Sequence, residues 1–421
     1  MDFIRRTRTT TAGLAILAGL GAGAALAQDG DVIRLGSITT LEGPFASGGQ
    51  DAYRAMEMLL EDYDYQVGGK RIEWIRESSN ADADVALARA RKLIEQDNVD
   101  IIVGPLSGAE GIALRDYSRT LEGKTFVNGS SGASDTTLRD PSPNFFRFST
   151  DGTQWMAGVG TYVHEEMDVD HVAVIAADYA FPYSQVFGFM HEFCGAGGAV
   201  TKLWSPLNTT DFSSIIARIP ADAGALVVVQ GGTDGLAFLT QYAQTGGELP
   251  IIAGSIMADQ TLMSARGPHQ RLMEGMISAG PIADINEHEN WQAFITRYRE
   301  RWPDGFDSPS IHAVNYYTNL QAVLLALEEV GGDLSDNQAA FQQALADLEF
   351  TNPMGATVRL DENRQAVSDI FLTRVVDQDG TLRTETFAKT EAVTQTMGMD
   401  QEAFMALGSP SRDNPDCPPA N

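Results

Sequence analysis

Three short apolar strands, each followed by a loop rich in Gly and Ser, most constrain how this chain can fold. The strands are IRLGSI from Ile33, IIV at 101–103 and TFV at 125–127, and their loops are TTLEGPFASGGQ, GPLSGAEG and NGSSGASD. Such alternation of strand, loop and helix predicts a parallel α/β sheet, which binds ligands where loop amides and helix N-termini meet at the carboxyl ends of the strands. Because no evident catalytic group accompanies these loops, the pattern indicates a protein that binds small molecules.

The alternation of strands and helices occurs twice along the chain. In the first segment, hydrophobic periodicity predicts a strand over 71–77 and helices over 50–62, 84–96 and 110–121. After the bridge SPNFFRFSTDG a similar pattern restarts near Asp151. Here we expect helices over 154–166, 183–194, 211–219 and 235–245, and strands over 172–176, 200–204, 225–229 and 251–253. The restart predicts a second α/β domain of the same type.

From residue 279 onward the pattern becomes mainly helical, with helices expected over 289–302 and 310–330 as cover for one of the two sheets. A strand pair is expected over 367–376 and 381–387, around the turn Asp379-Gly380. These elements are too few for a third domain, so we expect the chain to cross back and complete two lobes joined by a hinge. The expected boundaries are 28–150 for the first part of lobe 1, 151–278 for the first part of lobe 2, 279–350 for the return to lobe 1, 351–395 for the hinge crossing that completes lobe 2, and 396–421 for a C-terminal tail.

The N-terminus is typical of an exported protein. Arg5, Arg6 and Arg8 precede an apolar run over 12–24, and ALA at 25–27 forms a small-x-small cleavage site. We therefore expect residues 1–27 to be a cleaved signal peptide, because the run is too short for a membrane anchor. The formal net charge of −28 at pH 7 argues against nucleic-acid binding, since an acidic surface repels phosphate.

Cysteine and histidine usage bears on redox state and catalysis. Cys194 and Cys417 form an even pair, which in an oxidising compartment favours a disulfide that holds the C-terminal tail; two separately buried thiols are the alternative. The six His show no HExxH arrangement, and neither a GxSxG nucleophile elbow nor a P-loop occurs in the sequence. We therefore expect neither an enzyme nor a metal site.

Four segments together resemble a known family: IRLGSITTLEGPFASGGQDAYRAMEM, ARARKLIEQDNVDIIVGPLSG, VAVIAADYAF and FSSIIARIPADAGALVVV. Each is similar to the branched-chain amino-acid-binding type of ABC-transporter solute-binding protein, and the resemblance runs in order from Ile33 to about Asp377. It implies a class I periplasmic binding protein fold, with two Rossmann-like lobes on parallel-sheet cores joined by a multi-strand hinge. It also implies a periplasmic protein without a metal or organic cofactor, which delivers a small-molecule ligand to an inner-membrane ABC permease. We expect a monomer.

The candidate ligand-binding residues lie on loops that follow strands of the two lobes. They are Phe45, Ser107, Gly108, Ala109, Ser130, Ser131, Gly132, Phe181, Thr233, Asp234 and Ile256. The amides of 107–109 precede a predicted helix, whose dipole helps to hold a carboxylate without a buried cation; an ordinary capped loop is the alternative. From the resemblance, the loop at 130–132 supplies further donors and Phe181 closes over the ligand, although Phe181 also fits a plain core position.

Because the chain departs from the family pattern at several positions, the resemblance does not identify the ligand. By resemblance, hydroxyl-bearing residues that hold a carboxylate are common at Gly108 and Gly132, and an acidic residue that pairs with a ligand ammonium falls at Ile256. An apolar side chain cannot neutralise a buried ammonium. Three acidic residues are candidates to substitute: Asp234, Asp259 and Glu110. We expect a receptor of an ABC importer for an amino acid or a related small carboxylate or amide, with an aromatic-acid carrier or a periplasmic ligand sensor as alternatives.

Overall fold

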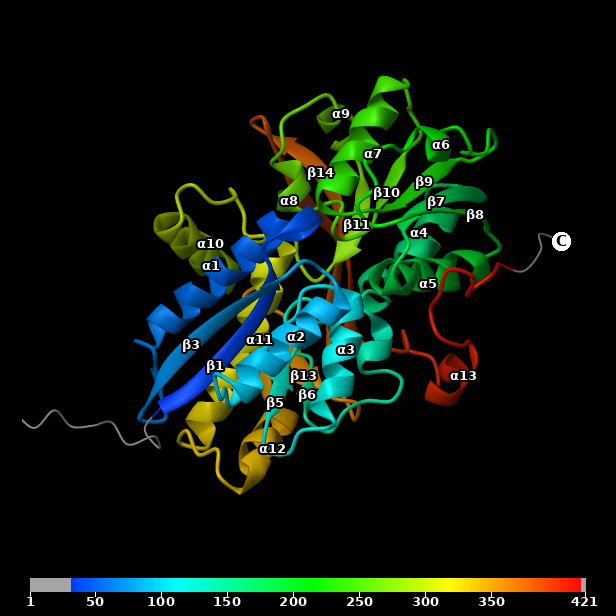
Figure 1. Cartoon of the computed structure of the whole chain (residues 1–421). Coiled ribbons are helices and arrows are strands. Elements are labelled where there is room, and N and C mark those ends of the chain that lie inside the picture. The colour runs from blue at the N-terminus through cyan, green and yellow to red at the C-terminus, as the bar shows by residue number, and fades with distance from the viewer. Residues whose placement is uncertain (1–31, 418–421) are drawn as a thin grey trace, which may run out of the picture.

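The computed structural model of the chain describes residues 32–417, which form two α/β lobes (Figure 1). The predicted signal peptide, 1–27, lies outside the described residues. The sheet of the first lobe has the strand order β2-β3-β1-β4-β5-β6, and that of the second lobe runs β12-β13-β14-β11-β10-β9-β7-β8, with β15 paired to β14. Two sheets with separate strand orders confirm the two-lobed α/β architecture expected from the sequence.

The first-lobe sheet is parallel at its centre because helical crossovers connect its strands. The strands are β1 (Val32–Thr40), β2 (Gln66–Val67), β3 (Lys70–Ser79), β4 (Ile101–Val103), β5 (Thr125–Val127) and β6 (Phe145–Phe146). β1 pairs in parallel with both β3 and β4. One face carries α1 (Ala46–Asp62) and α11 (Ile311–Glu329), and the other carries α2 (Ala83–Glu95) and α3 (Gly108–Ser118).

The second-lobe sheet is built in the same way and is extended by antiparallel strands. Its parallel strands are β7 (His171–Ala177), β8 (Ala199–Ser205), β9 (Ala225–Val229), β10 (Ile251–Ala253) and β11 (Ile277–Gly280). The antiparallel strands are β14 (Ala366–Gln378), β15 (Thr381–Val393), β13 (Thr357–Leu360) and β12 (Glu349–Thr351). One face carries α4 (Val159–Glu165) and α5 (Ala180–Gly195), and the other carries α6 (Ser213–Ile216), α7 (Gly232–Gln244), α8 (Gln260–Met263) and α9 (Gln270–Met273).

Most predicted helices are confirmed within a few residues, but the helix expected over 154–166 is wrong as a single element. A 3-10 turn over Gln154–Met156 is followed by a break before α4, because Gly158 adopts a left-handed conformation with φ of 87°. The helix expected over 211–219 is reduced to the short α6. The helix expected over 310–330 is α11, whose N-cap Ser310 accepts a hydrogen bond from the Ala313 amide at 3.2 Å.

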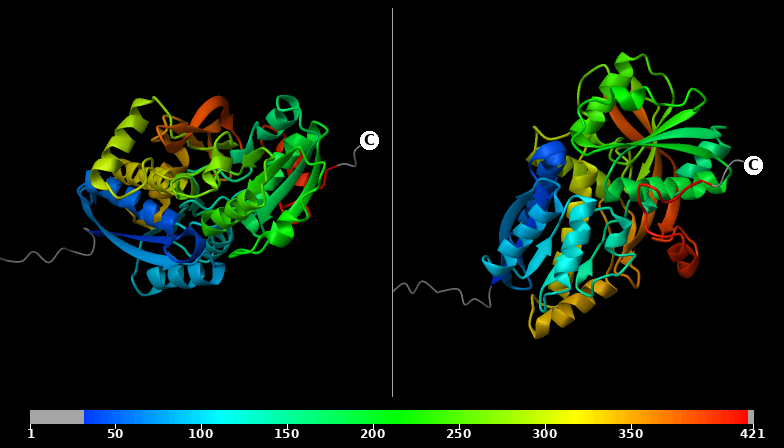
Figure 2. Two further views of the ribbon diagram at one scale, coloured as in Figure 1. Left: turned by 90° about the horizontal axis from the view of Figure 1, so that it is seen from above. Right: turned by 45° about the vertical axis from the view of Figure 1, so that its right-hand side comes forward.

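Three chain segments cross between the lobes and form the hinge. The two lobes lie side by side (Figure 2). The first crossing covers 147–153, between β6 and α4. The second follows β11 and leads to α10 (Glu289–Arg301), which packs on α1 in the first lobe. The third leads from α12 (Ala339–Asp347) through β12 and β13 into β14. The second half of the chain therefore completes both lobes.

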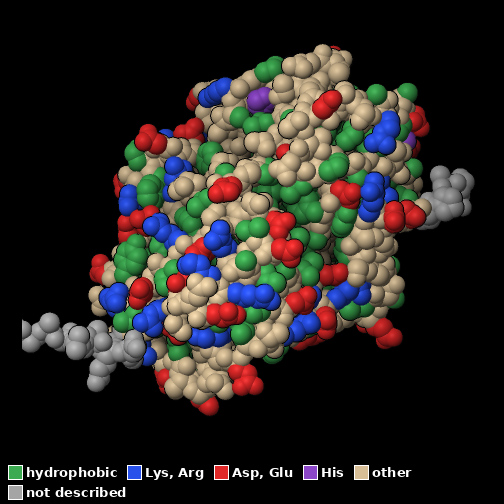
Figure 3. Space-filling model, viewed as in Figure 1, with side chains coloured by type: hydrophobic (Ala, Val, Ile, Leu, Met, Phe, Trp, Pro, Cys, Tyr) green, Lys and Arg blue, Asp and Glu red, His purple; other side chains and the backbone are tan. Residues whose placement is uncertain are grey.

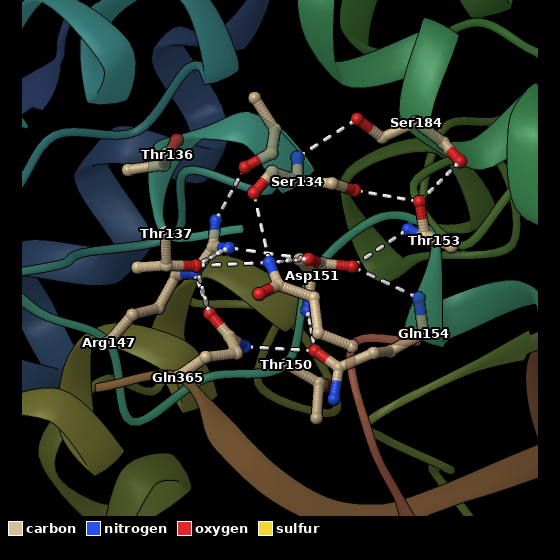
Figure 4. Close-up of polar contacts among 12 residues, drawn as sticks. Ser134, Thr136, Thr137, Arg147, Thr150, Asp151, Thr153, Gln154, Ser184 and Gln365 are labelled. Atoms are coloured by element: carbon tan, nitrogen blue, oxygen red, sulfur yellow. Dashed lines mark hydrogen bonds and ion pairs between the residues drawn. The ribbon is translucent and has the colours of Figure 1, made fainter. Parts of the chain in front are cut away.

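A buried polar network ties the first and third crossings together (Figure 4). The fully buried Arg147 pairs with Asp151 at 3.3 Å and donates to the side-chain oxygen of Gln365. Gln395, which follows β15, donates to Asp151 at 2.6 Å. Arg147 also donates to the carbonyl of Ala133 at 2.7 Å, and so positions the loop after β5. Because breaking a buried ion pair costs about 3–5 kcal/mol, the network holds these hinge segments in one arrangement.

Candidate ligand-binding site

A small cavity lies between the lobes, at the carboxyl ends of their strands. Its lining comes from both lobes: Phe45, Leu106, Ser107, Gly108, Ser130 and His312 from the first, and Trp155, Tyr179, Phe181 and Ile256 from the second. The loops after β1, β4 and β5 meet the loops after β7 and β10 here. On the face shown in Figure 3, hydrophobic side chains gather where the two lobes meet.

The structure brings together part of the set of residues predicted from the sequence. Those that line the cavity are Phe45, Ser107, Gly108, Ser130, Phe181 and Ile256, whereas Ala109, Ser131, Gly132, Thr233 and Asp234 are outside its lining. The carboxylate of Asp234 accepts hydrogen bonds from the amides of Asn208 (2.7 Å) and Thr209 (3.2 Å) within the second lobe. A role of the predicted residues in ligand binding stays a prediction.

The amides expected to hold an anion are largely occupied within the first lobe. The Ser107 amide donates to Glu110 Oε2 at 2.9 Å as part of a capping box. The amides of 130 and 131 both donate to the carbonyl of Pro105, at 3.0 and 3.2 Å. These bonds correct the expectation that Ser107 and the loop after β5 present free amides. Gly108, the first residue of α3, lines the cavity, and its amide has no acceptor within residues 32–417.

Phe181 explains why Gly108 and Gly132 carry no side chain. A Cβ atom at Gly108 would lie 2.9 Å from Phe181 Cβ, and one at Gly132 would lie 2.8 Å from the Phe181 ring. The two glycines therefore let the second lobe approach the first, which a hydroxyl-bearing residue would prevent. The ring of Phe181 also packs edge-on against Trp155, with centroids 5.4 Å apart, so it serves both as cavity wall and as core.

His312 is a cavity residue that no sequence pattern indicated. It lies in the first turn of α11, and its Nδ1 is 2.9 Å from Ser130 Oγ, to which Asn315 Nδ2 donates at 3.1 Å. The imidazole occupies the space beside Gly48, where any side chain would overlap it. This glycine is the only sequence signal for His312, because it leaves room for a ring from another segment. Trp155, Tyr179 and Leu106 also line the cavity without having been predicted.

Burial lowers the pKa of His312 to about 4, so the imidazole is neutral at pH 7. Because Asn315 already donates to Ser130 Oγ, two proton arrangements remain. Either the Ser130 hydroxyl donates to Nδ1 and Nε2 carries the proton, or Nδ1 donates to Ser130 and the hydroxyl proton is free. In both cases the neutral pair of Ser130 and His312, which lines this end of the cavity, keeps one donor proton, and such a donor suits a carboxylate or carbonyl oxygen.

The cavity lining described above contains no Asp, Glu, Lys or Arg. The three carboxylates that were candidates to pair with an ammonium instead accept hydrogen bonds from backbone amides. Asp234 accepts from the Asn208 amide (2.7 Å), Asp259 from the Ile311 amide (2.7 Å) and Glu110 from the Ser107 amide (2.9 Å). Since burying an unpaired charge costs several kcal/mol, the arrangement suits ligands without a cationic group.

The two lobes are closed over the cavity. Asp259 of the second lobe accepts the hydrogen bond from the Ile311 amide of the first, and Ser184 Oγ of the second lobe accepts one from the Ser134 amide at 3.0 Å. Burial raises the pKa of Asp259 to about 6, because its carboxylate is shielded from water. The amides of Ile311 and Ser134, which donate across the lobes, therefore report directly on whether the lobes are closed.

Residues 32–417 contain one disulfide and no cluster suited to a metal ion. Within 32–417, no group of three or more His, Cys, Asp or Glu is placed to hold a metal ion. No helix in this part of the chain combines the length and apolar character needed to span a bilayer. Cys194 and Cys417 are joined in a disulfide, with their Cα atoms 5.2 Å apart.

Similarity to known proteins agrees with this fold. A family model described as periplasmic binding protein matches residues 32–381. Leu/Ile/Val-binding protein homolog 6 of Brucella melitensis is 24% identical over 367 residues, which cover 85% of this chain and 90% of the relative. The structure of an ABC transporter substrate-binding protein from Sphaerobacter thermophilus is 28% identical, with a TM-score of 0.77, over 86% of this chain and 98% of that one. A solute-binding protein of an ABC transporter from Rhodopseudomonas palustris, in complex with 3,4-dihydroxybenzoic acid, is 24% identical, with a TM-score of 0.79, over 87% of this chain and 99% of that one.

Two hinged lobes closed over a small cavity define a solute-binding protein. The chain belongs to the periplasmic binding protein family. The family resemblance seen in the sequence and the class I fold that it implied are both confirmed. The chain is thus a solute-binding protein of the kind that serves ABC transporters, and its family is a periplasmic one.

Proposed function

We propose that the chain is the periplasmic receptor of an ABC importer and captures, by hinge closure, one small carboxylate or amide that lacks an ammonium group. The observation that carries this proposal is the chemistry of the cavity between the lobes. Its polar end consists of the neutral Ser130 and His312, and its walls are mostly aromatic and aliphatic. An inner-membrane permease that accepts the closed form is the expected partner.

The aromatic lining of the cavity supports a ligand with a flat ring. Phe45, Tyr179 and Phe181 surround the cavity, with ring centroids of Phe45 and Tyr179 6.5 Å apart and of Tyr179 and Phe181 6.4 Å apart. Such rings suit a flat apolar body, whereas an amino acid would bring an ammonium for which the lining holds no carboxylate.

Hinge closure provides the mechanism of capture. The ligand touches Ser130 and Gly108 in the first lobe and Phe181 and Ile256 in the second only when the lobes are together. A ligand with more contacts in the closed form shifts the population toward it. The shape of the closed form then distinguishes the loaded from the empty protein.

A thermal-shift screen tests the ligand class. Mature protein freed of ligand by unfolding and refolding should be stabilised by benzoate, 3,4-dihydroxybenzoate or benzamide, and not by leucine. A ligand that binds only the native state adds RT ln(1 + [L]/Kd), about 2.7 kcal/mol at 100 times Kd. Stabilisation by leucine alone would reverse the proposed ligand class. Turnover of a stabilising compound would contradict a receptor.

Substitution of His312 tests the polar end of the cavity. We expect His312→Phe to weaken binding of a stabilising carboxylate about tenfold, because a hydrogen bond to a charged group is lost. Ile256→Val is the matched control, since it removes only one methylene from the opposite wall and should change the Kd less. Calorimetric titration measures both. Equal affinities of His312→Phe and the wild type would place the ligand oxygen elsewhere.

A further inference from the structure

The C-terminal tail, which the structure describes over residues 396–417, contacts both lobes. It begins after β15 and lies beyond the segment 32–381 that matches the family model. It contains α13 (Gln401–Ala406), which lies next to α5 in Figure 1. The tail is therefore an addition to the two-lobed body.

The end of the tail is fastened to the second lobe. Cys417 is bonded to Cys194 at the end of α5. Lys202 on β8 donates to the carbonyls of Asp413 (3.0 Å) and Pro415 (2.8 Å) and pairs with Asp416 at 3.1 Å. Because the covalent bond and these contacts act on the same few residues, this end of the tail must move with the second lobe.

The middle of the tail bridges to the first lobe. Phe404 of α13 is buried, with 1% of its surface exposed, in a small core with Leu138 of the first lobe and Phe187 of the second. The rings of Phe187 and Phe404 meet edge-on, with centroids 5.7 Å apart. Arg139 of the first lobe donates to the carbonyl of Met405 at 3.1 Å. The helix α13 therefore packs against residues of both lobes.

We propose that the C-terminal tail is a strap that favours the closed form of the protein. When the lobes separate, the tail follows the second lobe, because Cys417 and Lys202 hold it there. Phe404 and Met405 must then leave Leu138 and Arg139, which exposes apolar surface and breaks a hydrogen bond. Opening carries this cost only while the tail is fastened at its end.

Hydrogen exchange of the ligand-free protein tests the strap. The amides of Ile311 and Ser134 are bonded across the lobes, so their exchange reports opening without any ligand. We expect exchange at both amides to rise roughly tenfold in Phe404→Ala and in the pair Cys194→Ser with Cys417→Ser. Gln401→Ala is the matched control, because Gln401 lies in the same helix, α13, but is exposed, so exchange at the amides of Ile311 and Ser134 should equal the wild type.

The outcomes separate a strap from a tail that is merely attached. Faster exchange at Ile311 and Ser134, with β9 unchanged, is the result expected for a strap. Unchanged exchange at these two amides in both variants would overturn the proposal. Faster exchange across β9 as well would also overturn it, because the tail would then stabilise the whole fold rather than closure. Should the cysteine variant not fold, Phe404→Ala alone decides.

Discussion

Replacing Gly232 with Ala should abolish ligand-induced closure and weaken ligand binding about 100-fold. Gly232 is the first residue of α7 in the second lobe, and a Cβ atom there would overlap the carbonyl oxygen of Pro44 in the first. A backbone carbonyl cannot rotate away as a side chain can, so the lobes must stay apart. The fold of each lobe is unaffected by this contact, because it exists only between them.

Gly246→Ala provides a matched control. Gly246 follows α7 in the same lobe and has a positive φ of 75°, comparable with 54° at Gly232, but a Cβ atom there meets nothing within 4 Å. Both substitutions carry the same local backbone cost. Small-angle scattering and calorimetry with the ligand found by thermal shift should show compaction and binding in Gly246→Ala and neither in Gly232→Ala. Compaction of both variants would mean that the lobes close in another arrangement.

The second large effect is expected from pH, through two buried groups that act in opposite directions. Burial raises the pKa of Asp259 to about 6 from 3.8. Because Asp259 accepts a hydrogen bond across the lobes from the Ile311 amide, we expect opening to hydrate its carboxylate, so the closed form should hold this proton more tightly and gain stability as the pH falls below 6. Burial lowers the pKa of His312 to about 4 from 6.5. Because His312 lines the cavity, we expect opening of the lobes to hydrate it, so the open form should hold that proton more tightly and closure should weaken as the pH falls below 6.5. In the wild type the two effects partly cancel.

Single substitutions should separate these two contributions. When the pH falls from 8 to 5, the ligand affinity of His312→Gln should rise about tenfold, because only Asp259 then titrates with closure. Over the same fall in pH, the ligand affinity of Asp259→Asn should decrease about tenfold or more, because only His312 then titrates with closure. The two variants thus diverge by about 100-fold at pH 5. Parallel pH profiles in the two variants would show that the cavity does not control protonation of either group. Asp284, whose negative charge adds to the raised pKa of Asp259, is present in both.

Much of the fold could be predicted from the sequence. The strands expected over 101–103, 125–127, 225–229 and 251–253 coincide with β4, β5, β9 and β10. Each is a fully buried apolar run bounded by loop residues, which is a local signal. The break at Gly158 was missed, because a single Gly within a helical pattern does not show that its φ is positive. The two lobes and the hinge followed from the restart of the strand and helix pattern near Asp151 and from the few elements after residue 279, and the family resemblance implied the same fold.

The candidate site was only partly predictable. Phe45 and Gly108 were predicted because they lie on loops that follow strands, and Ile256 was predicted from the family resemblance; all three line the cavity. His312 and Ser130 are 182 residues apart in the chain, and no local pattern joins them. The amides of Ser107 and of the loop after β5 looked available in the sequence, yet a capping box and the Pro105 carbonyl occupy them.

The sequence by itself determined the strands, the helices and the edge of each sheet at which loops gather, because these follow from periodicity and loop composition over a few residues. Only the tertiary structure decided which groups face the ligand, which carboxylates are already bonded and how the C-terminal tail reaches both lobes. The physical reason is that hydrogen bonds and burial between distant segments depend on how closely the two lobes pack, and the packing of the lobes is not encoded in any short stretch of the chain.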